Sequence, residues 1–566
     1  MRSAFILIAI LLAFTPILPG VVASDNPTAW GALYEVGFSG KTILASPSTM
    51  DVSSGQLYVG LKAEISPSSS WDLLIINPES NSSVLYYLDA GDNSITPLAL
   101  SYAGGEFKVA ASLEADHIYY AVMVDTKGIH EYTVAGQQLG YRVIKLDSAY
   151  IGKSLVVYGG SDTGEPFLLV INTSSWDTWG YTIRSPTSPE HEEIIDVKED
   201  KGIIYALGKI VWSIDEWVGT SLLALKPRGD IVSYATLSTG KNTRLEPAAL
   251  AVLSDGRIVV GGSTTASTTV SYDYSDAWIA VLKITPEGFQ LEKSFFFGGD
   301  SEDSITSIIP TSDGGFVVIG NTWVNGEKIF VVKFDSNSNP AGVELITDPG
   351  TEGVITASAD HGIVYIGSAY IGYGFMDGSY KPIASPIILS LPYNQTVNIT
   401  WNQCPQWGCP HKVSALYYHS LTDAGIPVKI AEIGVETYNP NTELVKITNS
   451  SLPVEDKSHK ISLKPYIARV LQQYTTTTGT SEKPFRTTTL TEQTTASTRT
   501  SMESTSSLSK PKSVTASRST QIQTTQKVTE ASTDVSNQRG KGSGFSVLAV
   551  IVVALMIAGI IILMKR

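Results

Sequence analysis

Residues Asp303–Leu345 read DSITSIIPTSDGGFVVIGNTWVNGEKIFVVKFDSNSNPAGVEL, and this stretch decides the fold. It contains a strand, a tight turn at Asp313-Gly314, an apolar strand ending at Gly320, a loop, a second apolar strand and a polar turn. Asp-Gly is favoured in hairpin turns because such turns need positive φ. The apolar strands do not alternate with polar residues, so we expect them to be buried on both faces.

The same pattern occurs seven times along the chain. Each unit has a run of branched residues that ends in a small anchor residue, and successive anchors are about 50 residues apart. The anchors are Gly60, Ala111, Gly160, Gly208, Gly262, Gly320 and Gly367. A repeat of this length built only from strands and turns is typical of β-propeller blades. We therefore predict an all-β fold with a seven-bladed β-propeller over residues 29–401.

Two details of this propeller follow from the repeat. We expect the anchor to be small because the second strand of each blade packs closely near the hub. Either the N-terminal run ALYEVGF (residues 32–38) or the run TVNITW (residues 396–401) completes the last blade.

The unit SDGGFVVIGNT…KIFVVKFD resembles prokaryotic, in particular archaeal, secreted and membrane-anchored β-propeller repeat surface proteins. The resemblance covers the fifth and sixth units well and the other units only loosely. It implies a propeller fold and a surface location, and no particular activity. The signatures of the WD40, kelch and quinoprotein propeller families are absent from the sequence.

Both ends of the chain resemble membrane-targeting segments. Arg2, an apolar run over residues 4–18 and small residues up to Ser24 predict a secretory signal peptide over residues 1–24; an uncleaved anchor is the alternative. Residues 544–564 are apolar and uncharged, and at ~1.5 Å per residue they can span a ~30 Å hydrocarbon layer as a helix. The alternative there is a buried soluble helix. With a cleaved signal, the chain becomes a type I single-pass protein of the cell membrane, with residues 565–566 in the cytoplasm.

Two further segments separate the propeller from this predicted helix. Residues 402–473 contain strand-like runs and are expected to form a small β module, or to pack against the propeller. Residues 474–543 are rich in Ser and Thr, have almost no apolar residues, and cannot offset the entropy of backbone ordering by burial. Their composition indicates an O-glycosylated stalk, with an unmodified flexible linker as the alternative.

The composition restricts the choice of partner. The chain of 566 residues has a net charge of −14, and only 17% of its residues are charged. This surface offers no basic stripe for phosphate groups, so we expect no nucleic-acid partner.

The blade topology sorts the connections onto two faces. First-to-second and third-to-fourth turns lie on one face, here called the turn face. Second-to-third loops and the links between blades lie on the other, here called the loop face. Three of the five N-glycosylation sequons fall in third-to-fourth turns, and the full set is Asn81, Asn172, Asn394, Asn398 and Asn449. Glycans would therefore gather on the turn face.

The loop face carries aromatic residues with interspersed carboxylates, a combination that binding surfaces use. We predict that this face binds a glycan or a protein on a neighbouring surface or envelope. The alternative is that these rings pack only against their own loops. The candidate ligand-binding residues are Trp212, Trp217, Tyr272, Asp273, Tyr274, Asp276, Trp323 and Tyr373.

Other candidate chemistry is sparse. Cys404 and Cys409 are the only cysteines and, in a secreted chain, are expected to form a local disulfide. The sequence shows no metal-ligand doublet and no nucleophile elbow, so we expect no metal, no cofactor and no assigned catalytic residue. Residues 335–339 begin like a calcium loop, but Pro340 stands where that loop has Gly, which favours a polar hairpin turn.

The sequence therefore favours a cell-surface recognition, adhesion or envelope protein that presents a propeller head on a stalk. One alternative is an extracellular glycoside hydrolase or lyase that acts on polysaccharide, for which paired carboxylates such as Asp273 and Asp276 could serve. A substrate receptor associated with a transporter is the other. A cluster of carboxylates with shifted pKa values would favour the enzyme.

Overall fold

A computed structural model gives the fold of the chain, which divides into two compact units, residues 1–486 and 487–566. All described residues belong to the first unit. They are residues 29–34, 37–38, 41–42, 44–53, 56–65, 70–76, 85–89, 94–103, 106–115, 118–125, 128–132, 143–151, 153–174, 178–183, 185, 189–213, 217–226, 230–239, 243–265, 275–298, 302–323, 327–348, 353–376, 379–401, 410, 412–438, 445–448, 462–466, 470–472 and 476–478.

Sheets 1 to 3 follow one another along the chain. Sheet 1 contains β4 (Leu44–Ser53), β5 (Gln56–Ile65), β6 (Ser70–Ile76) and β7 (Leu85–Asp89). Sheet 2 contains β8 (Ser94–Ala103), β9 (Glu106–Ala115), β10 (Ile118–Asp125) and β11 (Gly128–Tyr132). Sheet 3 contains β12 (Val143–Ile151), β13 (Ser154–Ser161), β14 (Pro166–Asn172) and β15 (Thr178–Ile183).

Sheets 4 to 6 repeat this order. Sheet 4 contains β16 (His191–Asp200), β17 (Ile203–Ser213), β18 (Trp217–Leu225) and β19 (Ile231–Ser238). Sheet 5 contains β20 (Leu245–Val252), β21 (Ile258–Thr264), β22 (Asp276–Thr285) and β23 (Gly288–Phe297). Sheet 6 contains β24 (Ser304–Pro310), β25 (Phe316–Trp323), β26 (Glu327–Phe334) and β27 (Pro340–Thr347).

Sheet 7 joins the two ends of this series. It contains β28 (Thr356–Asp360), β29 (Ile363–Met376), β30 (Ser379–Pro392) and the N-terminal strand β1 (Trp30–Tyr34). β1 pairs antiparallel with β30, with Leu33 opposite Ile387. Of the two runs predicted to complete the last blade, the N-terminal one therefore does so. A separate two-stranded sheet is formed by β2 (Gly37–Phe38) and β3 (Lys41–Thr42).

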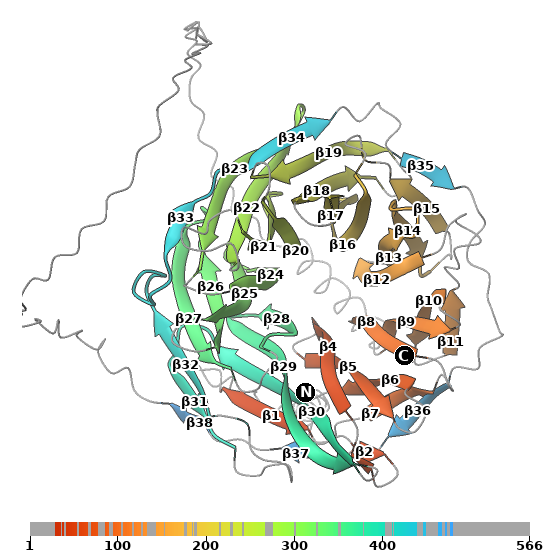
Figure 1. Ribbon diagram of the computed structural model, residues 1–566, viewed down its shortest axis with the longest axis vertical. Coiled ribbons are helices and arrows are strands. Elements are labelled where there is room, and N and C mark those ends of the chain that lie inside the picture. The colour runs from red at the N-terminus through yellow and green to blue at the C-terminus, as the bar shows by residue number, and fades with distance from the viewer. Residues whose placement is uncertain are drawn as a thin grey trace, which may run out of the picture. The chain divides into compact units, whose positions relative to one another are not determined.

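The sheets follow one another around a ring. The first strands of consecutive sheets contact each other, and β28 of sheet 7 contacts β4 of sheet 1. Figure 1 shows these first strands around the centre and the later strands of each sheet farther out. All regular structure in the described residues is β, so the fold is all-β with a β-propeller-like arrangement.

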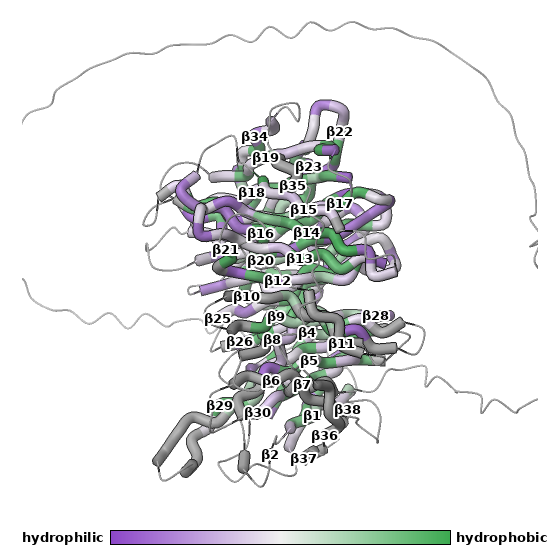
Figure 2. The backbone as a smooth tube through the Cα atoms, turned by 90° about the vertical axis from the view of Figure 1, so that its right-hand side faces the viewer, coloured by the Kyte–Doolittle hydropathy of each residue, from purple (hydrophilic) through white to green (hydrophobic). Residues whose placement is uncertain are grey.

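The core lies between neighbouring sheets. One hydrophobic cluster joins sheets 5 and 6 and includes Ile279 of sheet 5 and Phe330 of sheet 6. A second cluster joins sheets 3 and 4, and a third joins sheets 4 and 5. Six consecutive residues, 277–282, are buried in β22. Burial on both faces is what the continuous apolar runs predict. In Figure 2 hydrophobic residues lie along the strands and hydrophilic residues concentrate at their ends.

Most of the seven small anchors lie opposite an irregularity in the first strand of their sheet. In sheets 1 to 6 the first strand has a β-bulge, and in each case the bulge lies opposite the anchor. A Cβ atom on Gly262 would lie 1.9 Å from the carbonyl oxygen of Glu246, and one on Gly320 would lie 2.0 Å from that of Ser304. At these two anchors the bulged backbone of the first strand occupies the space of a side chain, whereas a Cβ atom on Gly160 or Gly367 would instead meet side chains of the next sheet, Glu193 at 3.1 Å and Met50 at 2.8 Å.

Strands from residues 397–478 add to the outer edges of these sheets. They are β31 (Val397–Ile399), β32 (Val413–Tyr418), β33 (Val428–Ile430), β34 (Gly434–Tyr438), β35 (Val445–Thr448), β36 (Ser462–Tyr466), β37 (Val470–Gln472) and β38 (Thr476–Thr478). β32, β33, β34 and β35 extend sheets 6, 5, 4 and 3, and β36 and β37 extend sheets 1 and 7. The small β module predicted for residues 402–473 is thus, in its described part, a series of outer strands on other sheets. Figure 1 shows these strands around the outside of the ring.

None of the residues described above forms a helix long and apolar enough to cross a membrane. The predicted signal peptide, stalk and transmembrane helix lie outside the described residues, so they stay predictions.

Candidate functional site

The loop face contains two carboxylates that converge on one glycine. Asp276 is the first residue of β22, and Asp303 lies in the link just before β24. A Cβ atom on Gly298 would lie 2.6 Å from Oδ1 of Asp276 and 2.5 Å from Oδ2 of Asp303. By the triangle rule these two oxygens are therefore no more than about 5 Å apart, so the two carboxyl groups are close neighbours. The backbone N–H of Asp303 donates to the carbonyl of Ser275 at 2.6 Å, which fixes the link against sheet 5.

The two carboxylates have different surroundings. Burial raises the pKa of Asp276, and the ammonium group of Lys429 in β33 opposes this shift. The side chain of Asp276 is half-buried, so it remains in contact with solvent. Asp303 is only 1% exposed. Asp276 is therefore the member of the pair that a solvent-borne ligand could reach, and the proton it holds is bound more tightly than on an ordinary aspartate.

An exposed tryptophan lies at the loop-face end of the neighbouring sheet 6. Ser304, which follows Asp303, pairs with Asn321 in β25, and Trp323 stands two residues further along that strand. Asn321 Oδ1 accepts the backbone N–H of Val354 at 2.8 Å and so ties sheet 6 to sheet 7. Trp323 is 53% exposed, which is unusual for so large an apolar side chain.

Apart from Asp276 and Trp323, Trp212 is the one predicted loop-face residue whose side chain belongs to the described part of the chain. The ring of Trp212 packs across its own hairpin: a Cβ atom on Gly219 would lie 2.4 Å from that ring, which agrees with the alternative that such residues pack their own loops. Trp217 begins β18 and Tyr373 lies in β29, but their side chains lie outside the described part. Tyr272, Asp273 and Tyr274 also lie outside the described residues.

Ion pairs link neighbouring sheets where their first strands begin. Lys145 Nζ of sheet 3 lies 2.8 Å from Glu193 Oε1 of sheet 4, and Lys209 Nζ of sheet 4 lies 2.7 Å from Glu246 Oε1 of sheet 5. Burial acts to raise the pKa of Glu193, but hydrogen bonds and charge from His191 and Lys145 outweigh it and lower that pKa to about 2. Glu193 is therefore ionised at neutral pH, and its contact with Lys145 could not be predicted from sequence because the two residues lie on different sheets.

The pKa of the neighbouring residue Glu192 is raised, whereas that of Glu193 is lowered. Glu192 is 3% exposed and accepts hydrogen bonds from Ser221 Oγ at 2.6 Å and from Tyr234 Oη at 3.2 Å. Burial raises its pKa to about 7, although these two hydrogen bonds and the charge of His191 act to lower it. Its depth makes Glu192 a poor candidate for contact with a ligand.

A third set of charges lies further along the inner strands. Asp196 accepts a bond from Lys198 Nζ at 2.7 Å and from the backbone N–H of Leu250 in sheet 5 at 2.9 Å. Asp147 of sheet 3 faces this pair. Protein surrounds its carboxyl group on most sides although some solvent contact remains, and this burial raises its pKa to about 7, with a further contribution from the charge of Asp196.

On the turn face, the stretch that resembles a calcium loop is a polar hairpin turn, as predicted. Asp335 Oδ1 accepts the backbone N–H groups of Asn337 and Asn339 at 2.9 and 2.8 Å. Ser338 has a φ of 58°, the left-handed conformation that closes the turn. Two carbonyl groups of this turn accept bonds from cationic side chains.

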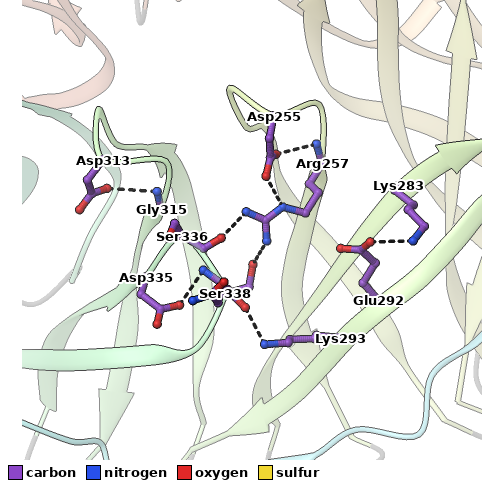
Figure 3. Close-up of polar contacts among 11 residues, drawn as sticks. Asp255, Arg257, Lys283, Glu292, Lys293, Asp313, Gly315, Asp335, Ser336 and Ser338 are labelled. Atoms are coloured by element: carbon purple, nitrogen blue, oxygen red, sulfur yellow. Dashed lines mark hydrogen bonds and ion pairs between the residues drawn. The ribbon is translucent and has the colours of Figure 1, made fainter. Parts of the chain in front are cut away.

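Those cations come from sheet 5. Arg257 donates to Ser336 O at 2.5 Å and to Ser338 Oγ at 2.6 Å, and Lys293 donates to Asn337 O at 2.5 Å. Figure 3 shows both side chains reaching from sheet 5 to the turn of sheet 6. Because Arg257 follows the β20–β21 turn, its contact shows that first-to-second and third-to-fourth turns share this face. Among the described residues, no group of three or more His, Cys, Asp or Glu side chains could hold a metal ion.

The predicted modification sites are only partly described. Asn172 ends β14 and accepts the N–H of Ser174 at 2.9 Å, and Asn394 is exposed with a φ of 67°. Asn398 lies in β31, where its amide oxygen accepts a bond from Ser414 Oγ at 2.8 Å. Asn81, Asn449 and both cysteines, Cys404 and Cys409, lie outside the described residues.

Comparisons with known proteins find similarity only at the level of structure. No protein-family model matches the chain, and no curated protein matches it. The endosialidase of phage phi92 is 10% identical with a TM-score of 0.33, and the match covers 67% of this chain and 72% of that chain. The Bombyx mori GH32 beta-fructofuranosidase BmSUC1 is 10% identical with a TM-score of 0.24, covering 70% of this chain and 94% of that chain. At these TM-scores the likenesses carry no argument about activity.

Proposed function

We propose that this chain is a cell-surface protein whose head binds an extracellular glycan on the loop face. The head would be one closed ring of seven blades, namely sheets 1 to 7. Support for the ring comes from the contact of each sheet with the next and of sheet 7 with sheet 1. Support for the surface location comes from the apolar ends of the sequence and from the Ser/Thr-rich segment, which would act as membrane anchor and stalk.

The observation that carries glycan binding is that the exposed Trp323 and the Asp276–Asp303 pair both lie at loop-face ends of two neighbouring sheets, 6 and 5. An aromatic ring offers a flat apolar surface for the C–H face of a sugar, and carboxylates accept hydrogen bonds from its hydroxyl groups. Both features lie on rigid strand ends of sheets 5 and 6, so little ordering entropy is lost when a ligand binds.

A panel of immobilised glycans tests this proposal directly. The purified ectodomain should bind at least one class of glycan, and Trp323→Ala should weaken that binding at least tenfold without lowering the melting temperature. Leu416→Ala is the matched control, because Leu416 is also a large exposed apolar side chain, 43% exposed, but lies on the outer strand β32 of sheet 6 and is not one of the candidate binding residues. Equal binding by the native protein and the Trp323→Ala variant would refute the assignment of the face.

The carboxylate pair favours a second candidate, hydrolysis of a glycosidic bond. Burial raises the pKa of Asp276, so this half-buried carboxyl group could serve as the acid that protonates a leaving oxygen, while the deeply buried Asp303 beside it would act on the reaction without touching the sugar. The ectodomain would then release reducing ends from a polysaccharide, and Asp276→Asn would abolish this release while Trp323-dependent binding remained. If the native protein binds a glycan and never cleaves it, the chain is a binding protein and the second candidate is wrong.

A further inference from the structure

Residues 413–478 run around the ring against the chain order of the sheets. Their strands lie on sheet 6 (β32), then sheets 5, 4 and 3, then sheets 1 and 7. The final strand, β38, returns to sheet 6, where it pairs with β31, and β31 in turn pairs with β32. This segment thus makes one complete circuit and ends beside its own beginning. We call it the clasp.

Two pairings of the clasp, β37 with β1 and β38 with β31, have a different role from the others. β37 pairs with β1, with Leu471 opposite Leu33. Of the four strands that make up sheet 7, β1 is the one that is distant in sequence from the other three, and it has only five residues. Its pairing with β30 is therefore the seam at which the ring closes. Without β37, the outer edge of this seam would be an uncovered strand edge.

The pairing of β38 closes the clasp itself. Asn398 in β31 lies opposite both Ser414 of β32 and Thr477 of β38, so the middle strand holds the two ends of the circuit together. A side-chain bond from Ser414 Oγ to Asn398 Oδ1 at 2.8 Å reinforces this pairing. The other outer strands extend sheets whose four preceding strands are continuous in sequence, and those sheets need no clasp to stay complete.

We propose that the clasp is a device that holds the ring shut, and that β38 and β37 must detach before β1 can leave sheet 7. The reason is geometric. β1 is paired on one side with β30 and on the other with β37, so its release requires the loss of two ladders rather than one. A five-residue strand with a single ladder would fray readily, because terminal strands are held by few hydrogen bonds.

Proline substitutions combined with hydrogen exchange test this device. Val470→Pro with Leu471→Pro removes two consecutive backbone N–H groups of β37, and since successive N–H groups point to opposite sides, one of them faces β1. Amide exchange at residues 30–34 should then become at least tenfold faster. The matched control, Lys446→Pro with Ile447→Pro in β35, should speed exchange only in residues 180–183 of sheet 3.

A second variant keeps the test decisive if the proline variant fails to fold. Leu33→Cys with Leu471→Cys places a disulfide between opposed positions of β1 and β37, and its oxidation should slow exchange at residues 30–34 at least tenfold relative to the reduced form. The device is refuted if the proline variant folds and leaves residues 30–34 as protected as in the native protein. It is also refuted if the control exposes these residues equally, or if the disulfide forms without changing their exchange.

Discussion

Glu344 allows a quantitative test of how the clasp attaches to the ring. Glu344 lies in β27, directly opposite Tyr417 of β32, and is only 1% exposed. Its Oε1 has no hydrogen-bond partner among the described residues. Burial alone raises its pKa to about 8, and it in turn contributes to raising the pKa of Tyr393 and Tyr417, where burial is the larger cause. The clasp therefore covers a carboxyl group that stays neutral at pH 7.

The sign and size of the pH effect follow from this pKa. The folded state binds a proton that the unfolded chain has lost above the ordinary pKa of 4.5. Stability is therefore highest below pH 4.5, falls as the pH rises, and levels off above pH 8. With 1.36 kcal/mol per pKa unit, the penalty at pH 7 is on the order of 3 kcal/mol.

Glu344→Gln removes this titration while keeping the shape of the side chain. The free energy of unfolding of the variant relative to the native ectodomain should increase by roughly 2–3 kcal/mol between pH 5 and pH 7, as measured by urea denaturation. The comparison uses the change with pH and not the absolute difference, because a buried amide without a partner has its own constant penalty. Glu287→Gln, in an exposed turn, is the control and should show no such change. A pH-independent difference for Glu344→Gln would show that β32 does not bury this carboxyl group.

Two further substitutions test other parts of the fold. Gly262→Ala should destabilise the protein by more than about 3 kcal/mol, because its Cβ would meet the bulged backbone at Glu246. The control Gly434→Ala, whose Cβ would lie 3.5 Å from its nearest atom, should change stability by under about 0.5 kcal/mol. Equal effects of the two substitutions in thermal denaturation would contradict the bulge explanation. Arg257→Ala should lower stability by about 1–3 kcal/mol and increase hydrogen exchange in residues 335–339 of the neighbouring sheet, and an unchanged exchange pattern would show that this contact does not hold the turn.

The β architecture could be predicted from the sequence because its signals are local and repeated. Asp313-Gly314 marks a hairpin turn, and runs such as residues 316–320 can only be strands buried on both faces. The repeated anchor was visible as well, but its physical reason was not. A β-bulge has no clear sequence signature, although Pro47, Pro97 and Pro247 stand at three of the bulges, where proline is tolerated.

The strand-like runs of the clasp could be recognised in the sequence, but their pairing could not, because the strands are short and their partners are distant in sequence. Val428–Ile430 pairs with Phe295–Phe297, and nothing in a three-residue run indicates which edge it will cover. The candidate site shows the same limit. Asp276 was predicted as a loop-face residue, but its partner Asp303 was not among the candidates, because their convergence depends on the contact between sheets 5 and 6.

The assignment of the loop face and of the clasp depends on the closure of the ring by the N-terminal strand. A disulfide between Ala32→Cys and Ile388→Cys, at opposed positions of β1 and β30, measures this closure most directly. Mass spectrometry of the oxidised ectodomain should find the peptides of residues 32 and 388 joined in most molecules, with glycan binding unchanged. Free and freely labelled thiols at both positions in the folded protein would contradict the closed ring.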